Sequence, residues 1–348
     1  MTQIGQLRER LRAAGAKPAH ERRVLRLWAN ALPQDSGKRD IDDFLPRPLR
    51  EALPAIEAEL AGLARIVSKH PAQDGSERLL VGLADGQTCE AVLLPRGGLC
   101  VSSQVGCAVG CRFCMTGKDG LLRQIGSAEI VAQVALARTL RPVSKVVFMG
   151  MGEPAHNLAN VMEAIELLGT AGNIGHKSLV FSTVGDERVF ERLPQGPVKP
   201  ALALSLHTTR DDLRAELLPR ATRIRPADLV EAGDQYARAT GYPMQVQWTL
   251  LEGVNDTEEE IEGIVRLLKG RYAVLNMIPY NTVPDLPFKR PAWEKAAEMA
   301  RRLHRAGVLT KLRHSAGQDV EGGCGQLRAR GVREAGEGQV VMWVGRAG

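Results

Sequence analysis

The chain has 348 residues, 44% of them hydrophobic, and a formal net charge of +6. This is enough apolar material to bury a full core, and the length suits one large domain with a smaller appendage. No stretch approaches the roughly 18 uncharged apolar residues of a membrane span, and the start lacks the apolar run of a signal peptide, so we expect a cytoplasmic protein that binds no membrane.

The first segment, 1–75, has the pattern of a small helical domain. Apolar residues recur at helical spacing over 5–30 and 47–68, and the stretch between them is rich in turn residues. Residues 1–50 contain eleven Lys and Arg against six Asp and Glu. This segment is either a surface that faces phosphates or an ordinary solvated helical face, and the charge pattern alone does not separate the two.

A β-hairpin extension is predicted for 76–106. The run LLVGLADGQTCEAVLLP contains two strand-like segments, and Asp85-Gly86 between them is a pair favoured in hairpin turns. The hairpin leads directly into a cluster of cysteines that begins at Cys107.

Strand-like and helix-like segments alternate over 107–327, and 328–348 is left as a tail. Helical patterns occupy 127–140, 158–170, 225–240, 257–269 and 292–306, and strand-like runs begin near 144, 178, 201, 244, 272 and 308. This alternation predicts an α/β fold of βαβ units, with a parallel sheet that forms a full or partial barrel. Active-site groups of such folds lie at the carboxyl ends of strands, and the candidates there are GMGEP at 150–154, Ser182, Ser205, His207, Asn281 and the stretch after His314.

The six cysteines are Cys89, Cys100, Cys107, Cys111, Cys114 and Cys324. In a reducing compartment, a tight group of cysteines indicates metal binding or catalysis rather than disulfides. Three thiolates can hold three irons of a 4Fe-4S cluster and leave the fourth iron open to a small molecule. A zinc site would need a fourth ligand nearby, and the next His or Cys after Cys114 is His156.

The spacing Cys107-x3-Cys111-x2-Cys114 resembles that of the radical SAM superfamily, in which the open iron binds S-adenosylmethionine (SAM). GMGEP resembles the segment of that superfamily that contacts the SAM amino group. The resemblance narrows to the RlmN/Cfr family of radical SAM RNA methyltransferases through the order of GLCVSSQVGC, CRFC, VVFMGMGEP, FSTVG, LALSLH, GVND, MIPYN and CGQL. It implies a partial TIM-like radical SAM barrel with a small helical accessory domain.

The resemblance also implies roles for individual residues. The cluster ligands would be Cys107, Cys111 and Cys114, and the SAM pocket would be lined by Gly152, Glu153, Ser182, Ser205, Leu206, His207 and Asn281. Cys324 would carry a methyl group, Cys100 would be its partner, and Glu90 matches the family's proposed general base. Cys89 matches no motif, and we interpret it as a core residue.

The chemistry of such a family explains two cysteines outside the cluster. C2 and C8 of adenine are too electron-poor to displace a methyl group from SAM, whereas a thiolate does so easily. In the family scheme Cys324 takes a methyl group from one SAM, a deoxyadenosyl radical from a second SAM removes a hydrogen from it, and the carbon radical adds to the ring. Glu90 would remove the ring proton, and a transient disulfide between Cys100 and Cys324 would release the product. The plainer reading of the two thiols is a pair of small core residues.

The chain departs from the family pattern at GQDVEGGCGQL, where paired acidic residues and Ala-Ala are usual before the methyl carrier. We expect methylation of adenine C2 in ribosomal RNA, with C8 and transfer RNA as open alternatives. A radical SAM enzyme for a peptide or small molecule and a non-catalytic iron-sulfur or RNA-binding protein are the other classes. The expected partners are structured RNA and an electron donor such as flavodoxin or ferredoxin, and the expected state is a monomer.

Overall fold

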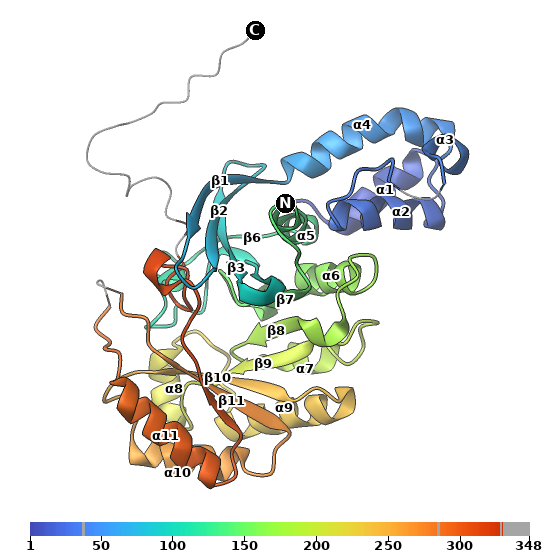
Figure 1. The fold of residues 1–348 in the computed structure, drawn as a ribbon. Helices are drawn as coiled ribbons and strands as arrows, with labels where there is room; N and C mark the ends of the chain where they lie inside the picture. The colour runs from blue at the N-terminus through green and yellow to red at the C-terminus, as the bar shows by residue number, and fades with distance from the viewer. Residues whose placement is uncertain (37–38, 284–285, 328, 330–348) are drawn as a thin grey trace, which may run out of the picture.

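The computed structural model describes residues 1–36, 39–283, 286–327 and 329, so the predicted tail lies outside the described residues except for residue 329. A curved sheet forms the centre of the molecule, and helices cover its outer side (Figure 1). The strand order in this sheet is β1-β2-β3-β4-β7-β8-β9-β10-β11-β12. None of the helices in the described ranges is long and apolar enough to cross a membrane.

The parallel part of the sheet forms most of a barrel. Its strands are β4 (Gly98–Cys100), β7 (Lys145–Phe148), β8 (Leu179–Thr183), β9 (Ala201–Ser205), β10 (Met244–Leu250), β11 (Ala273–Pro279) and β12 (Thr310–Leu312). Among the described residues β12 pairs only with β11, so the barrel stays open between β12 and β4, and we name this opening the seam. The predicted α/β fold with a partial barrel is confirmed.

Helices alternate with these strands along the chain, as predicted. They are α5 (Ser127–Arg138), α6 (Leu158–Gly169), α7 (Glu187–Arg192), α8 (Asp211–Leu217), α9 (Pro226–Thr240), α10 (Glu258–Leu268) and α11 (Trp293–Arg305). The short helix α7 was not predicted, because it is not long enough to show a helical period.

Burial explains the sequences of the barrel strands. All of β8 and nearly all of β9 are buried, and strands that are covered on both faces are continuous apolar runs such as LVFST and ALALS. In β10 the residues alternate between buried and half-buried positions. One face of β10 therefore packs under the helices, while the other carries polar side chains.

Beyond β4 the sheet continues as three antiparallel strands, β1 (Ala64–Pro71), β2 (Glu77–Leu83) and β3 (Thr88–Leu94). The predicted hairpin is β2–β3, and Gly86 in its turn has φ of 84°, a conformation that favours glycine. The prediction of a helix over 47–68 is wrong at its end, since α4 (Arg47–Gly62) stops and the chain pairs with β2 from Ala64 on. As an edge strand, β1 is half exposed and its period is easily mistaken for that of a helix.

The amino-terminal module consists of α1 (Ile4–Ala13), α2 (Pro18–Ala29), α3 (Ile41–Phe44) and α4. The predicted helical stretch 5–30 is two helices, with Gly15 between them at φ of 85°. The module packs against α5, where the buried Ile4 N donates to Ser127 Oγ at 2.8 Å.

Candidate functional site

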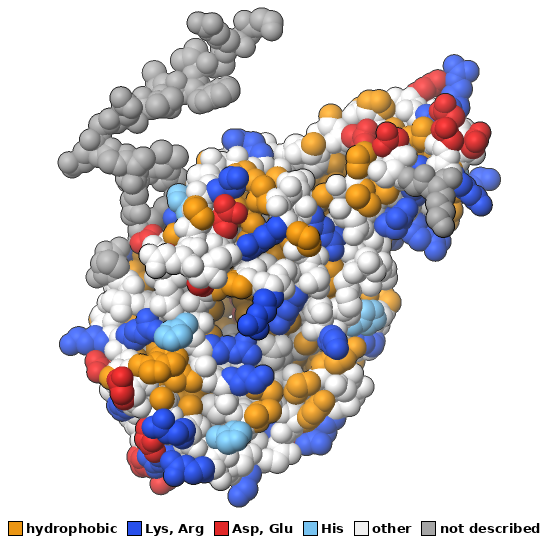
Figure 2. Space-filling model, viewed as in Figure 1, with side chains coloured by type: hydrophobic (Ala, Val, Ile, Leu, Met, Phe, Trp, Pro, Cys, Tyr) orange, Lys and Arg blue, Asp and Glu red, His pale blue; other side chains and the backbone are white. Residues whose placement is uncertain are grey.

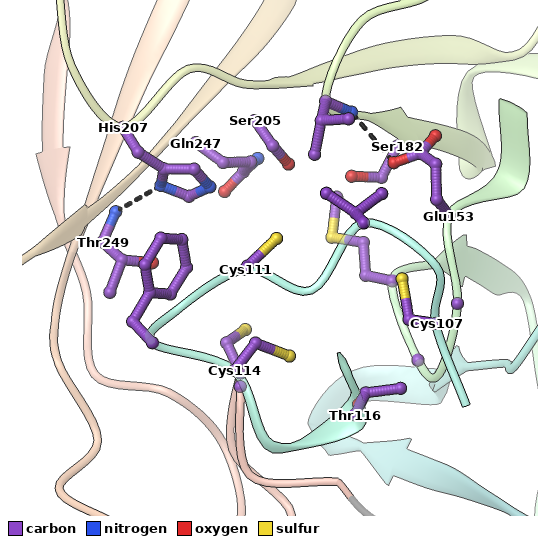
Figure 3. A pocket seen from close by; sticks show the side chains of 18 of the residues that line it. Cys107, Cys111, Cys114, Thr116, Glu153, Ser182, Ser205, His207, Gln247 and Thr249 are labelled. Atoms are coloured by element: carbon purple, nitrogen blue, oxygen red, sulfur yellow. Dashed lines mark hydrogen bonds between the residues drawn. The ribbon is translucent and has the colours of Figure 1, made fainter. Parts of the chain in front are cut away.

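The three clustered cysteines lie in a loop closed by a small separate sheet. In this sheet β5 (Gln104–Gly106) pairs with β6 (Leu121–Gln124), and Cys107 follows β5 directly. Gly110 has φ of 65° and lies against Gly117, where an added Cβ would be 2.7 Å from the Cα of Gly110. The loop therefore folds tightly on itself, and the three thiols face a common space (Figure 3).

The donor set of this loop suits a 4Fe-4S cluster. Burial and, to a lesser extent, the neighbouring thiols raise the pKa of Cys107 to about 12 and that of Cys111 well above its usual value. Thiolates crowded in this way need positive charge beside them, which iron ions supply. Over the described ranges, no three His, Cys, Asp or Glu side chains are arranged around a single metal ion.

The cysteine loop forms one wall of a cavity at the carboxyl ends of the barrel strands. The other walls include Gly152, Glu153, Ser182, Ser205 and His207, all of which were predicted as site residues. These side chains come from the ends of β7, β8 and β9 and point towards the same space (Figure 3). The structure therefore brings most of the predicted cofactor-binding residues together with the cysteines.

Glu153 is held at the cavity wall by a tight turn after β7. Gly152 has φ of 99°, and an added Cβ would be 2.5 Å from Gln104 Cβ. The Glu153 carboxylate is nearly fully buried and accepts the N–H groups of Ala155 at 2.9 Å and Val184 at 3.0 Å. Burial nevertheless raises its pKa to about 7. A buried carboxylate of this kind is stabilised in its charged form by a cation in the cavity, such as an ammonium group.

His207 presents a neutral ring to the cavity. Its Nδ1 accepts the N–H of Thr249 at 3.0 Å, so the ring proton is on Nε2 (Figure 3). Burial lowers the pKa of His207 to about 3, and Phe113 packs edge-to-face against it at 4.8 Å. The backbone of His207 has φ of 64°, a strained conformation for a non-glycine residue, which is typical of functional sites.

Two predicted pocket residues lie behind the cavity wall instead of on it. Leu206 is fully buried, and its carbonyl accepts from Arg214 Nη1 at 2.6 Å. Asn281 is buried, and its Nδ2 donates to Ser315 Oγ and to the Cys324 carbonyl, both at 2.9 Å. In this structure both residues support the elements that form the wall.

Cys324 and Cys100 approach each other from different elements. Cys324 lines the cavity and is solvent-exposed, and its N lies 3.4 Å from Ser315 Oγ. Cys100 ends β4 and is buried. Its pKa is raised by burial and then by the charge of Cys324, so the two side chains are near enough to interact. Both thiols are free.

Comparisons with known proteins agree with this site. Residues 101–268 match the family model described as Radical SAM superfamily. A probable RNA methyltransferase of Leptothrix cholodnii is 75% identical over 324 residues, which cover 93% of each chain. One of Methylibium petroleiphilum is 75% identical over 329 residues, which cover 94% of this chain and 93% of that one. The crystal structure of a radical SAM methyltransferase from Sphaerobacter thermophilus has a TM-score of 0.80 and 34% identity, covering 94% of this chain and 98% of that chain.

The chain belongs to this family of radical SAM methyltransferases. Its cofactors are accordingly a 4Fe-4S cluster and SAM, as predicted.

In this radical SAM methyltransferase, Glu90 lies on the strand next to Cys100. The pairing of Val92 with Cys100 puts Glu90 on the same face of the sheet as Cys100. Glu90 is fully buried, forms an ion pair with Arg78 at 2.5 Å and accepts the N–H of Ala329 at 3.1 Å. It is not part of the cavity lining. Cys89 is fully buried in the apolar core, as interpreted from the sequence.

Sequence reasoning missed several residues of the methyltransferase site. Gln247 and Thr249 of β10 line the cavity, and their alternation with buried apolar residues was a usable signal. Arg214 acts through side-chain contacts with the carbonyl groups of Leu206 and Val184, at the ends of two strands. No sequence pattern indicates such contacts.

Proposed function

We propose that this radical SAM methyltransferase methylates C2 of an adenine in ribosomal RNA, through a methyl group carried by Cys324. The observation that carries the proposal is an exposed thiol outside the cluster motif, in one cavity with the three cluster cysteines and Glu153. A second thiol, Cys100, lies near it. The names of the relatives support RNA as the substrate. A radical SAM enzyme for a peptide or small molecule would have no need of the second thiol.

The residues present can accommodate both cofactors. Cys107, Cys111 and Cys114 would hold the cluster, and Glu153 would accept hydrogen bonds from the amino group of SAM. Ser182, Ser205 and His207 line the same cavity and offer hydroxyl groups and the Nε2–H of a neutral imidazole as further partners. When bound, the two cofactors supply a methyl group and a radical that can remove a hydrogen atom from it.

Cys324 would do the covalent work as a thiolate nucleophile. Although the residue as a whole is exposed, desolvation of its thiol within the cavity raises its pKa, and the Ser315 hydroxyl opposes this by hydrogen bonding to the sulfur. Ser315 is held in place by Asn281 at 2.9 Å. The thiolate would first take the methyl group onto Sγ. The carbon of this methyl group would later bond to the adenine ring.

Release of the product would fall to Glu90 and Cys100. Glu90 would take the proton from the methylated ring carbon. The Cys100 thiolate would attack Sγ of Cys324, so that a sulfur-sulfur bond forms while the sulfur-carbon bond breaks. The electron pair of the broken bond would stay on the methylene carbon, which takes up a proton and becomes the methyl group of the product. The position of Glu90 and Cys100 on one face of neighbouring strands supports this pairing of roles.

Cysteine variants purified from cells test the proposal. Cys100→Ala should accumulate a covalent protein-RNA adduct, because no thiol is left to break the bond to Cys324. Cys324→Ala should form no adduct and carry no methyl group. Cys89→Ala removes a buried thiol from the neighbouring strand β3 and is the matched control, which should behave as the unmodified protein. The proposal is wrong if Cys100→Ala turns over normally, or if peptides with Cys324 never carry a methyl group.

Nucleoside mass spectrometry settles the finer points of the proposal. Ribosomal and transfer RNA from cells with and without the gene should differ in 2-methyladenosine in the ribosomal fraction. A difference in 8-methyladenosine would mean that the methylated carbon is C8. A difference confined to transfer RNA would mean that transfer RNA is the substrate. Reduction of the cluster by flavodoxin or ferredoxin in vitro would test the proposed electron donors.

A further inference from the structure

Three basic side chains gather at the seam of the barrel. Lys145 begins β7 on one side, and Lys311 and Arg313 lie in and after β12 on the other. All three are exposed. Partial burial, with the positive charges of Arg313 and Lys311, lowers the pKa of Lys145, so the three charges are close together across the seam.

No ion pair in the described part of the chain neutralises these charges. Arginines on the outer helices are different, since Arg302 pairs with Glu258 and Arg210 pairs with Glu259. A group of like charges without counter-charges costs stability, so its position calls for an anionic partner. In Figure 2, Lys and Arg side chains surround a hollow at the centre of this face, beside β12.

An aromatic stack begins at the residue that follows Arg313 in the chain, His314. The rings of Trp293 and His314 are parallel to within 6°, with centroids 4.0 Å apart. His314 is exposed, and Trp293 keeps 38% of its surface accessible. Arg290 lies 3.4 Å from His314 through Nη2 and Nδ1. Exposed rings flanked by positive charge are the combination with which proteins bind single-stranded RNA, because bases stack on the rings and phosphates contact the charges.

This surface leads directly to the proposed methyl carrier. Ser315 follows His314 in the chain, and its hydroxyl contacts Asn281 and the backbone of Cys324. A strand of RNA that lies along β12 would therefore lead towards the cavity that Cys324 lines.

We propose that the seam face, made of Lys145, Arg290, Trp293, Lys311, Arg313 and His314, binds a single-stranded RNA segment next to the target adenine. Lys145, Lys311 and Arg313 contact phosphates, and the stack of His314 on Trp293 receives a neighbouring base. The inference rests on RNA being the substrate, as proposed above. It concerns a different surface from the basic amino-terminal helices, where Arg10 and Arg12 already pair with glutamates.

Charge reversal tests the phosphate contacts. The double variant Lys145→Glu/Lys311→Glu should bind a fluorescein-labelled single-stranded RNA at least about tenfold more weakly, with a logarithmic salt slope shallower by about 1.4, or 0.7 for each lost phosphate contact. The matched control Arg266→Glu/Lys269→Glu makes the same change in net charge on exposed residues at the end of α10. Its salt slope should stay close to that of the unmodified protein. Equal losses in both double variants would refute the assignment to the seam.

Ring removal tests the stack. At about pH 8, His314→Ala and Trp293→Ala should each weaken RNA binding about 5- to 100-fold without changing the salt slope. Tyr272→Ala removes a ring that is exposed to a similar extent, 39%, on a different part of the molecule, and should bind as the unmodified protein does. Iron content and SAM binding should be normal in every variant. Unchanged RNA affinity in His314→Ala and Trp293→Ala would overturn the stacking role.

Three further outcomes distinguish this inference from the proposed function. If Cys100→Ala forms the RNA adduct but the seam variants bind RNA normally, the seam proposal fails and the proposed function stands. If the charge reversal leaves RNA binding intact and slows reduction of the cluster by flavodoxin, the face binds an acidic electron carrier and the proposal is overturned. If the unmodified protein neither binds RNA nor yields an adduct, both proposals fail.

Discussion

Arg214 provides the sharpest test of how the cavity is held open. Its guanidinium is 4% exposed and donates to carbonyl groups at the ends of two barrel strands. Nη1 reaches Leu206 O at 2.6 Å and Ser205 O at 3.2 Å, and Nη2 reaches Val184 O. Val184 also donates its N–H to Glu153. One side chain therefore fixes the walls that carry three predicted site residues, although it does not line the cavity itself.

The expected loss on Arg214→Gln follows from these contacts. Hydrogen bonds from a charged donor contribute about 1.5–3 kcal/mol each, so three would contribute roughly 4–9 kcal/mol if nothing opposed them. Burial lowers the pKa of Arg214 to about 10, so part of that energy only offsets the removal of a charge from water. We therefore expect the free energy of unfolding to fall by about 3 kcal/mol.

Anaerobic urea unfolding measures this loss. The urea midpoint for Arg214→Gln should drop by about 1 M, because the free energy of unfolding falls by a few kcal/mol for each molar increase in urea. Arg210→Gln is the control, since Arg210 is exposed and pairs only with Asp212 and Glu259, and its midpoint should hardly move. SAM affinity should fall in the first variant alone. Identical midpoints for the two variants would refute the claim that these hydrogen bonds hold the strand ends.

Three other substitutions follow from the same structure. Cys111→Ala should lose the cluster's iron and visible absorption while Cys89→Ala keeps both, and full iron content in Cys111→Ala would exclude the proposed ligation. Arg22 and Arg26 line a cavity of the amino-terminal helices, and the double variant Arg22→Glu/Arg26→Glu should weaken RNA binding in a salt-dependent way with normal iron content. If the dependence of RNA affinity on salt is unchanged, this segment is an ordinary solvated face. Gly152→Ala should lower stability by about 1–3 kcal/mol and weaken SAM binding, whereas Gly270→Ala, with a similar φ but open space around it, isolates the cost of backbone strain alone. A Gly152→Ala midpoint equal to that of Gly270→Ala would show that contact with Gln104 is unimportant.

The barrel could be predicted from the sequence because its strands are buried on both faces and its helices on one. Runs such as LVFST and ALALS have few other interpretations between helical segments of suitable length. Site residues at strand ends follow from the topology of parallel sheets, which explains why Ser182, Ser205 and His207 were found together. β1 was missed because an exposed edge strand has no continuous apolar run.

Residues that act through contacts across the fold could not be predicted. The burial of Arg214 and the ion pair of Arg78 with Glu90 depend on which strands become neighbours. The stack of Trp293 on His314 joins the start of α11 to the end of β12, and neither residue stands in a motif. Aromatic residues make up only 4% of the chain, and the proposed role of the seam face needs only this one exposed pair.

Asn281 is where the family resemblance and the geometry lead to different expectations. The resemblance implies that Asn281 binds SAM, yet its Nδ2 is committed to Ser315 and to the Cys324 carbonyl, both at 2.9 Å. Its Oδ1 is buried and accepts no hydrogen bond from the described residues. The two roles are compatible if the amide nitrogen anchors the Cys324 loop while the oxygen is left for a donor on SAM.

Substitutions at Asn281 distinguish the role of its amide nitrogen from that of its amide oxygen. Asn281→Asp keeps an acceptor and loses the donor, so it should retain SAM binding but release the Cys324 loop, whereas Asn281→Ala should lose both. Two hydrogen bonds of about 1 kcal/mol each hold the loop, so alkylation of Cys324 should be faster by roughly 10- to 30-fold in both variants, as followed by mass spectrometry with the cluster intact. Asn276→Asp, in the buried strand β11 that precedes Asn281, is a control that leaves the loop contacts in place. Normal SAM binding in Asn281→Ala would leave Asn281 with the anchoring role alone, and unchanged alkylation in both variants would mean that neither hydrogen bond holds the methyl carrier.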